Sequence, residues 1–276
     1  MTLPPKLFDH SILKIRRNRT DENSWFMHDK AIKEIHDRLS EINRDFEKIA
    51  IIGFRAKSWA KKLNLSATYI NDGDLINFDG KSYDLIIHAM GLHWANDPVG
   101  QLIQMKRALI PDGLVISVFF GGQTLSELRI SFAYAEAKIL NGISPRIAPM
   151  GEIRDLGGLL QRAGLALPVA DNIKFDVSYE TPLQLMHDLR GMAETNIIID
   201  RSRKTMTKKF FDEISKQYFH HFSDNNGRIN STFELIFLTG WAPAASQQKP
   251  LVPGSAKISL AQALNTTEKK PRKRLI

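Results

Sequence analysis

Short apolar segments alternate with helical segments along the first half of this chain, and this alternation constrains the fold more than any other feature. Four of the apolar segments are strand-sized and almost continuous, namely KIAIIGF, ATYIND, SYDLIIHAM and LVISVFF. Strands of this kind are buried on both faces, which is typical of a parallel sheet that helices cover on its two sides. We therefore expect an α/β fold with a mostly parallel, doubly wound sheet.

The second half of the chain predicts a different edge for the same sheet. The segment NIKFDVSYE alternates apolar and polar residues, as a half-exposed strand does, and STFELIFLTGW has the composition of a final long strand. Helices are expected between them, the first with Thr181 as its cap and Pro182 in its first turn. Two late strands separated by helices suit an antiparallel C-terminal edge.

These patterns predict three parts. A helical segment is expected over residues 1–45, and the main domain over 46–241 with a helical insertion at about 181–222. Residues 242–276 are rich in Ala, Ser, Gln, Pro and Lys and predict a mostly extended, basic tail.

Composition excludes several classes of site. The chain of 276 residues has no cysteine, which rules out disulfides, thiolate metal ligands and a cysteine nucleophile. Its eight histidines are scattered without a metal-binding spacing, so we expect no metal. No apolar run is long enough to span a bilayer, and the N-terminal residues lack the apolar core of a secretory signal. A cytoplasmic location is therefore expected.

The net charge of +8 is unevenly distributed. The run KKPRKR at 269–274 carries five positive charges, and a solvated tail with no nucleic-acid partner is the simplest interpretation. A second basic cluster, LKIRRNRT, contains Arg16, Arg17 and Arg19 on a helix with one apolar side. That helix is either a solvated face or a lid or partner-binding element.

Several longer segments resemble one known family. SYDLIIHAMGLHWANDPVGQLIQMKRALIPDGLVISVFFGGQTLSELR is similar to the fourth strand to fifth helix of Rossmann-like S-adenosylmethionine (SAM) methyltransferases. The segments LFDHSILKIRRNR, SPRIAPMGEIRDLGGLLQRAG and FELIFLTGWAP resemble one branch, above all its alphaproteobacterial members. That branch is related to the malonyl-carrier-protein methyltransferase of biotin synthesis and includes the mitochondrial complex I assembly factor described as a protein-arginine hydroxylase. The resemblance runs from about Leu7 to Leu264.

The resemblance implies two kinds of function. One is SAM-dependent methyl transfer to a protein or to a carrier-bound acid, a reaction that depends on alignment and desolvation more than on acid-base groups. The other is a non-catalytic or hydroxylase-like role in the assembly of respiratory complex I, with a subunit of that complex as partner. The segments after SYDLII keep the family pattern better than the cofactor half does, which favours a retained partner role.

The expected cofactor loop departs from the family pattern. The family has roughly hydrophobic-Asp-hydrophobic-Gly-Cys-Gly-x-Gly, and this chain has AIIGFRAK, which keeps only Gly53. Ile51, Arg55 and Lys57 stand at the Asp and two of the Gly positions. Because glycines let the backbone approach a ligand, we expect SAM binding to be weak or absent. Alternatively, Arg55 and Lys57 meet the carboxylate of the cofactor's methionine moiety, or they cover the site.

A second departure is one of length. Only about 30 residues separate Gly53 from Tyr83, too few for the two strand-helix units that the family has there. ATYIND is assigned to the family's third strand, which would put Asp72 and Gly73 near adenine. On this assignment one strand-helix unit is missing, and with it the acid that binds the ribose.

The resemblance and the strand ends together nominate two sets of residues, and no catalytic residue is assigned. Each has a simpler alternative, since a His-Trp pair can seat a helix, glycines can start one, and arginines commonly form surface salt bridges. The cofactor candidates are Gly53, Phe54, Asp72, Gly73, Ala89 and His93. The substrate or partner candidates are Gly122, Arg129, Arg146, Arg16 and Arg17.

Overall fold

A computed structural model of the chain describes residues 6–140, 142–203, 205–248, 254–255 and 258–266. The chain forms two compact units, Met1–Pro243 and Ala244–Ile276. In the second unit the structure describes one short helix, α9 (Leu260–Ala263), which begins at a capping box. The basic run at 269–274, for which the sequence predicts a solvated tail, lies outside the described residues.

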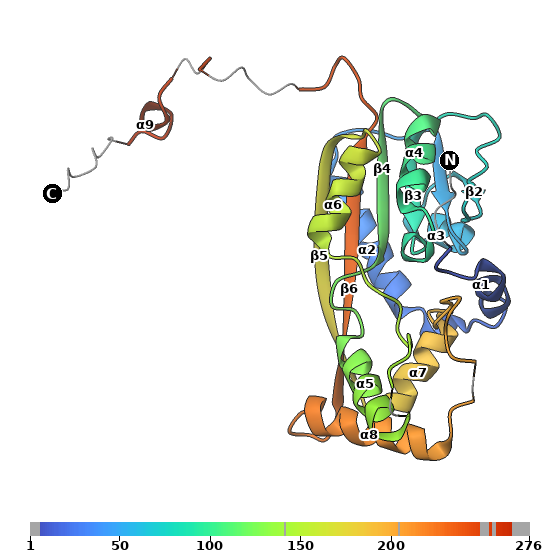
Figure 1. Cartoon of the computed structure of the whole chain (residues 1–276). Coiled ribbons are helices and arrows are strands. Elements are labelled where there is room, and N and C mark those ends of the chain that lie inside the picture. The colour runs from blue at the N-terminus through green and yellow to red at the C-terminus, as the bar shows by residue number, and fades with distance from the viewer. Residues whose placement is uncertain (1–5, 141, 204, 249–253, 256–257, 267–276) are drawn as a thin grey trace, which may run out of the picture. The chain divides into compact units, whose positions relative to one another are not determined.

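The first unit is built on one six-stranded sheet with the strand order β2-β1-β3-β4-β6-β5 (Figure 1). The first four strands in this order are parallel, and β6 is antiparallel to both β4 and β5. The expected α/β fold, mostly parallel with an antiparallel C-terminal edge, is confirmed. The strands are β1 (Ile49–Ile52), β2 (Ala67–Ile70), β3 (Tyr83–Ala89), β4 (Leu109–Phe120), β5 (Ala166–Tyr179) and β6 (Ile229–Trp241).

The position of β2 bears on one prediction from the sequence. Its four residues pair in parallel with those of β1, from Ile49 opposite Ala67 to Ile52 opposite Ile70. In a doubly wound sheet the strand beside the first is the second strand, not the third. β2 therefore stands in the position of the second strand, but in a sheet that lacks one strand-helix unit either strand would lie beside β1. The assignment of ATYIND to the third strand stays a prediction.

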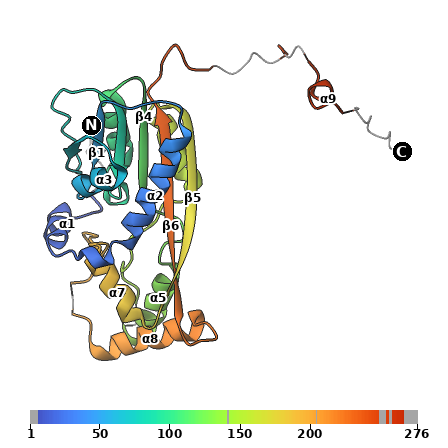
Figure 2. The same cartoon turned by 180° about the vertical axis from the view of Figure 1, so that it is seen from behind.

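Helices cover both faces of the sheet (Figures 1 and 2). On one face lie α2 (Phe26–Glu41) and α3 (Ala56–Leu63), and on the other lie α4 (Pro98–Ala108) and α6 (Ile153–Arg162). Alternate residues of β1 belong to the two separate apolar cores on these faces, as the strand period requires. No helix within the described ranges is long and apolar enough to cross a membrane.

Three further helices gather around the far ends of β5 and β6, as Figure 1 shows. They are α5 (Ser126–Leu140), α7 (Pro182–Gly191) and α8 (Lys208–Phe222). The predicted start of α7 is confirmed, because the side chain of Thr181 accepts a hydrogen bond from the backbone N–H of Gln184. Asp97 caps α4 in the same way, through a hydrogen bond from the backbone N–H of Gly100.

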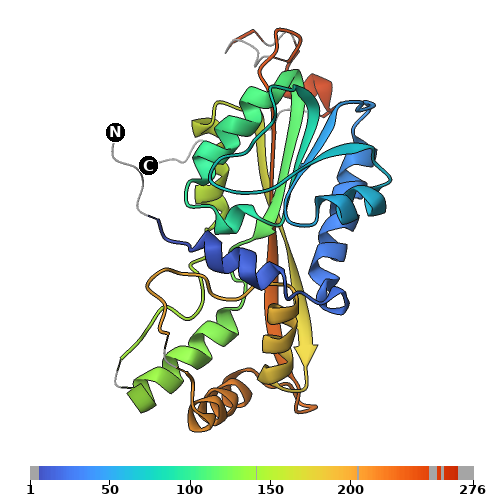
Figure 3. The same ribbon diagram turned by 90° about the vertical axis from the view of Figure 1, so that its right-hand side faces the viewer.

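The N-terminal helix α1 (His10–Arg17) lies across the edge at which the parallel strands end (Figure 3). Its predicted apolar side is confirmed in Leu13, which is buried against Trp94 and Ile197 in a small cluster. A backbone bridge between Phe8 and Ile198 ties the segment before α1 to the chain after α7. Two 3-10 helices, η1 (Glu22–Ser24) and η2 (Leu92–Trp94), complete this edge.

Candidate functional site

The carboxyl edge of the sheet, where β1, β2 and β3 end, brings two of the predicted cofactor residues together. Gly53 follows β1 with a φ of 144°, a conformation that side-chain-bearing residues rarely adopt. A Cβ at Gly53 would lie 2.6 Å from the carbonyl oxygen of Ala89, at the end of β3. Gly53 is therefore required by the close approach of two strand ends, whether or not a ligand binds there.

Asp72 stands two residues beyond β2 and is the residue to compare with the acid that binds a ribose. It is 19 residues after Gly53 (72 − 53) and follows the strand beside β1. The acid that binds ribose hydroxyls in dinucleotide-binding folds is found about 20 residues after the glycine loop. By this spacing Asp72 is a candidate for the ribose acid, and the loss of that acid stays a prediction.

The carboxylate of Asp72 is held by an arginine of α1. Arg17 donates from its two terminal nitrogens to the two Asp72 oxygens, both at 2.7 Å, and both side chains are largely buried. Burial alone would raise the pKa of Asp72, but the hydrogen bonds and charge of Arg17 outweigh it and lower that pKa. Asp72 is therefore an ionised acceptor whose present partner belongs to the protein.

A cavity of about 440 Å³ lies beside this pair, and we call it the Asp72 cavity. Its walls come from α1, from Phe54 in the loop after β1, from the residues after β2, and from η2 and the start of α4. Gly73 also lines it, so three predicted cofactor residues meet here. The volume lies in the range of small-molecule sites, and most of its lining is contributed by the carboxyl edge where open α/β sheets bind ligands.

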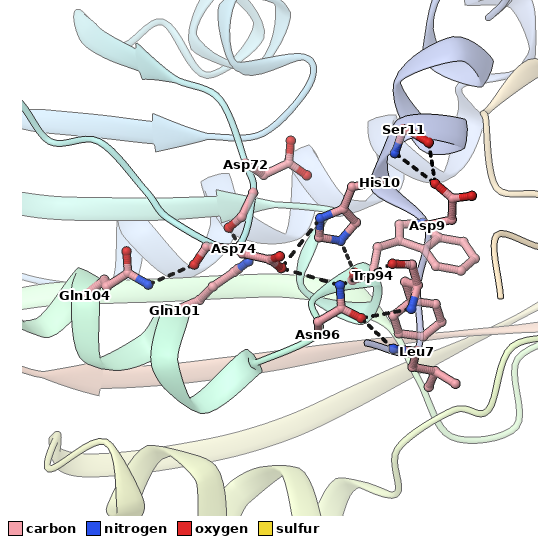
Figure 4. A network of polar contacts seen from close by, with 12 residues as sticks. Leu7, Asp9, His10, Ser11, Asp72, Asp74, Trp94, Asn96, Gln101 and Gln104 are labelled. Carbon is pink, nitrogen blue, oxygen red and sulfur yellow. Dashed lines mark hydrogen bonds and ion pairs between the residues drawn. The ribbon is translucent and has the colours of Figure 1, made fainter. Parts of the chain in front are cut away.

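Polar side chains hold the N-terminal segment beside this cavity through hydrogen bonds (Figure 4). Asn96 accepts from the backbone N–H groups of Leu7 and Phe8, each at 2.8 Å. A ring nitrogen of His10 lies 2.8 Å from the carbonyl oxygen of Trp94. Gln101 donates to the carbonyl oxygen of Gly73 at 2.7 Å. The segment before α1 and the loop after β2 are thus both held by the motif GLHWANDP and the helix that follows it.

Two buried histidines lie under this edge. His88, in β3, is fully buried and its Nε2 lies 3.1 Å from the side-chain oxygen of Gln101. His28, in α2, accepts a hydrogen bond from the indole nitrogen of Trp59 at 3.2 Å. Burial lowers the pKa of each to about 4. Both are consequently neutral in the folded protein near pH 7.

This burial predicts that the folded state loses stability on mild acidification. Between the ordinary histidine pKa of about 6.5 and the folded value, the unfolded chain binds protons that the native chain does not. Stability is therefore full above about pH 6.5 and falls by up to about 1.4 kcal/mol per pH unit for each histidine as the pH drops. Urea unfolding at pH 7.5 and at pH 5.0 measures the loss.

A matched pair of variants assigns that pH dependence. His88→Gln, which cannot titrate, should shrink the difference in unfolding free energy between the two pH values. The same change at the exposed His36 should leave it unaltered. Equal unfolding free energies at both pH values for the unmodified chain would show that the buried histidines do not resist protonation.

The predicted cofactor residue His93 faces a different neighbour. Its Nε2 is 2.8 Å from a carboxylate oxygen of Glu194, and Trp94 donates its indole N–H to the same oxygen at 2.9 Å. His93 is not among the described residues that line the Asp72 cavity. A direct role for it at the cofactor stays a prediction, and its evident structural role is to fix Trp94 against the chain after α7.

Gly122 is explained by packing. It has a φ of 53°, and a Cβ there would lie 2.3 Å from a carboxylate oxygen of the buried Glu234. That carboxylate accepts a hydrogen bond from the backbone N–H of Gln123 at 2.8 Å. The glycine thus makes room for a buried acid between β4 and β6, and a substrate role for it stays a prediction.

Arg129 and Arg146, two of the predicted substrate or partner residues, differ in how strongly the protein binds their side chains. Arg129 has one long contact, 3.5 Å, to the carbonyl oxygen of Ala148. Arg146 donates from Nε to Glu136 at 2.8 Å, and both side chains are largely buried. Burial opposes ionisation of Glu136, but the hydrogen bonds from Ser144 and Arg146 lower its pKa overall. Arg146 is therefore a fixed cation inside the protein.

Arg146 and Arg16 line a second, larger cavity of about 690 Å³, which we call the apolar cavity. It lies among the residues of β4, α5 and α7 and the chain after α7, and aliphatic and aromatic side chains form most of its wall. Arg16 also donates to the carbonyl oxygen of Asn196 at 2.5 Å. Trp94 lines both cavities, so the two are neighbours at this residue.

The basic residues of the loop after β1 do not face the Asp72 cavity. The guanidinium of Arg55 lies against the ring of Trp25, and burial lowers its pKa to about 10. Two of its nitrogens are buried without a hydrogen-bond partner among the described residues. Lys57 is exposed on α3. Contact of either residue with a cofactor carboxylate stays a prediction.

Comparisons with known proteins agree with this geometry. The family model described as "Methyltransferase domain" matches residues 28–117. The chain is 39% identical to the mitochondrial arginine-hydroxylase NDUFAF5 of Dictyostelium discoideum, over 68% of this chain and 43% of that protein. It is 32% identical to "Putative methyltransferase RP459" of Rickettsia prowazekii, over 56% of this chain and 68% of that protein. It is 30% identical to the malonyl-[acyl-carrier protein] O-methyltransferase of Laribacter hongkongensis, over 63% and 56%.

These matches, with the sheet order and the site at its carboxyl edge, show that the chain belongs to the methyltransferase family. The chain spans about half the length of several of the curated relatives that it matches. Within the part of the chain that the structure describes, no group of three acidic or histidine side chains could hold a metal ion.

Sequence reasoning missed three features of this site. The Arg17–Asp72 pair joins residues 55 positions apart, and Glu194 lies about 100 positions from the two side chains that it binds. No local pattern reports such pairings. The role of Asn96 could have been predicted, because it stands in the motif GLHWANDP and is a polar residue directly after a buried strand and a turn.

Proposed function

We propose that this chain binds SAM in the Asp72 cavity and transfers its methyl group to a protein-bound or carrier-bound acid. One observation carries the proposal: an ionised acid, 19 residues after the strand-end glycine Gly53, borders a cavity at the carboxyl edge. Asp72 fits the two hydroxyls of a ribose, because a carboxylate accepts two hydrogen bonds side by side, as it now does from Arg17.

The bound cofactor would supply an activated methyl group, and the residues of this chain would supply position and desolvation. Phe54 offers an aromatic wall on one side of the Asp72 cavity, and Trp94 forms part of its boundary with the apolar cavity. We expect weak binding, because the loop after β1 has a single glycine and because Arg17 must release Asp72 before a ribose can take its place.

Charge favours an acidic substrate over a cationic one. Among the described residues, five arginines and one acid, Glu194, line the apolar cavity beside Trp94. A guanidinium substrate, which the name of the arginine-hydroxylase relatives suggests, would meet like charge there. An acid, as in the name of the malonyl-[acyl-carrier protein] O-methyltransferase relatives, would meet opposite charge.

A calorimetric titration of the full chain with SAM and with S-adenosylhomocysteine tests the proposal. We expect saturable one-to-one binding of both, weaker than the sub-micromolar range. Failure of both to bind at millimolar concentration would overturn the cofactor proposal.

A second candidate function is a role in respiratory complex I assembly without methyl transfer, with a subunit of the complex as partner. The observation that favours it is the Arg17–Asp72 pair, which closes the cofactor site with the protein's own helix. The absence of cofactor binding in the titration would leave this candidate in place.

A further inference from the structure

The apolar cavity is large enough for a ligand of its own. Its volume of about 690 Å³ lies within the usual range for small-molecule sites, which bury most of an apolar ligand. Phe120, Leu128 and Phe132 line it and are themselves buried, so the inner wall is set by the packed core. Met186 and Met206 line it as well, and unbranched thioether side chains adapt to apolar groups of varied shape.

The charge of this cavity is as distinctive as its apolar lining. Five arginines and one glutamate are among its described lining residues, and two of the arginines have carboxylate partners outside the lining, Arg146 with Glu136 and Arg201 with Asp9. Arg16 and Arg201 also donate to backbone carbonyl oxygens, so three of the five arginines have partners within the protein. The side chains of Arg190 and Arg203 are exposed, and the structure records no hydrogen bond or ion pair for either within its described residues.

From these observations we infer that the apolar cavity binds an amphiphilic carboxylic acid with an extended apolar chain. The chain lies against the phenylalanine and methionine side chains, and the carboxylate binds among the arginines, with Arg190 and Arg203 available to pair with it in bidentate fashion. Removal of the apolar chain from water drives binding. This inference deepens the proposed function. It rests on that function in one respect, namely that the acid bound in the apolar cavity is the substrate.

Two amphiphiles with the same chain and opposite head charge test the inference directly. Dodecanoate and dodecyltrimethylammonium are titrated into the full chain below their micelle concentrations, without any cofactor. We expect one-to-one binding of dodecanoate, at least about tenfold tighter than that of the cationic probe. Equal affinity of the two probes, or no binding of dodecanoate, would overturn the inference.

Variants separate the two parts of the site. The double reversal Arg190→Glu and Arg203→Glu should weaken dodecanoate binding about tenfold. Arg154→Glu, an exposed arginine outside the cavity lining, should leave it unchanged. Met186→Trp, at a half-buried lining position, should weaken binding of both probes by filling the cavity, and Met186→Leu should not. If neither the charge reversals nor Met186→Trp changes the affinity for dodecanoate, the ligand binds elsewhere on the protein.

The outcome is independent of the cofactor proposal. Failure of dodecanoate to bind, together with binding of S-adenosylhomocysteine, would reject the amphiphile alone. Binding of dodecanoate without binding of S-adenosylhomocysteine would reject the cofactor alone.

Discussion

Asp72→Asn should reduce the affinity for S-adenosylhomocysteine by at least about tenfold, whereas Arg17→Gln should increase it. The two changes break the same ion pair, at 2.7 Å for both contacts, from opposite sides. Asparagine keeps one acceptor oxygen but is uncharged and has an NH2 donor in place of the other, which costs about 1.4 kcal/mol or more of the free energy of binding to the ribose hydroxyls. Loss of the guanidinium leaves the carboxylate in place and removes its competitor.

The same two variants should both lower the free energy of unfolding, by about 2 kcal/mol each, because a largely buried charged partner is left without its hydrogen bonds. Calorimetric titration measures affinity and urea unfolding measures stability. Asp79→Asn serves as the control, since Asp79 is an exposed residue with a φ of 51°, which asparagine tolerates. If Arg17→Gln weakens binding as Asp72→Asn does, Arg17 contacts the ligand and does not compete with it.

Gly53→Val should destabilise the folded chain by about 3 kcal/mol, independently of any cofactor. The substituted residue would have to keep a φ of 144°, and its Cβ would overlap the carbonyl oxygen of Ala89 at 2.6 Å. Backbone strain and overpacking each cost roughly 1–3 kcal/mol. The oxygen cannot readily move, because Ala89 pairs with Val118 in the centre of the sheet.

Gly158→Ala is the matched control for that change, because Gly158 lies in α6 and a Cβ there meets nothing within 4 Å. Alanine should stabilise α6 by up to about 1 kcal/mol. Urea unfolding compares the two variants with the unmodified chain. A loss below about 1 kcal/mol for Gly53→Val would show that the strand ends can separate, and that the glycine is kept for another reason.

The parallel sheet and its antiparallel edge were predictable, because both are recorded in local patterns. Continuous apolar strands indicated burial on two faces, and the alternation in NIKFDVSYE indicated a half-exposed edge. The caps at Asp97 and Thr181 follow from the chemistry of the first turn of a helix, which involves neighbouring residues only.

The site was less predictable because its contacts join distant parts of the chain. The place of β2 in the sheet depends on strand pairing, which no local pattern in ATYIND records. The pairing of Arg17 with Asp72 could not be predicted, because a charged residue on a basic helix gives the same sequence pattern whether it is solvated or paired. Glu194 follows a helix with no motif around it, although it fixes both His93 and Trp94.

The most direct measurement of the central claim is a crystal structure of the full chain with S-adenosylhomocysteine. We predict the ligand in the Asp72 cavity, with its ribose hydroxyls within about 3 Å of the Asp72 carboxylate and with Arg17 turned away. A ligand bound elsewhere, or a ribose that leaves the Arg17–Asp72 pair intact, would contradict it.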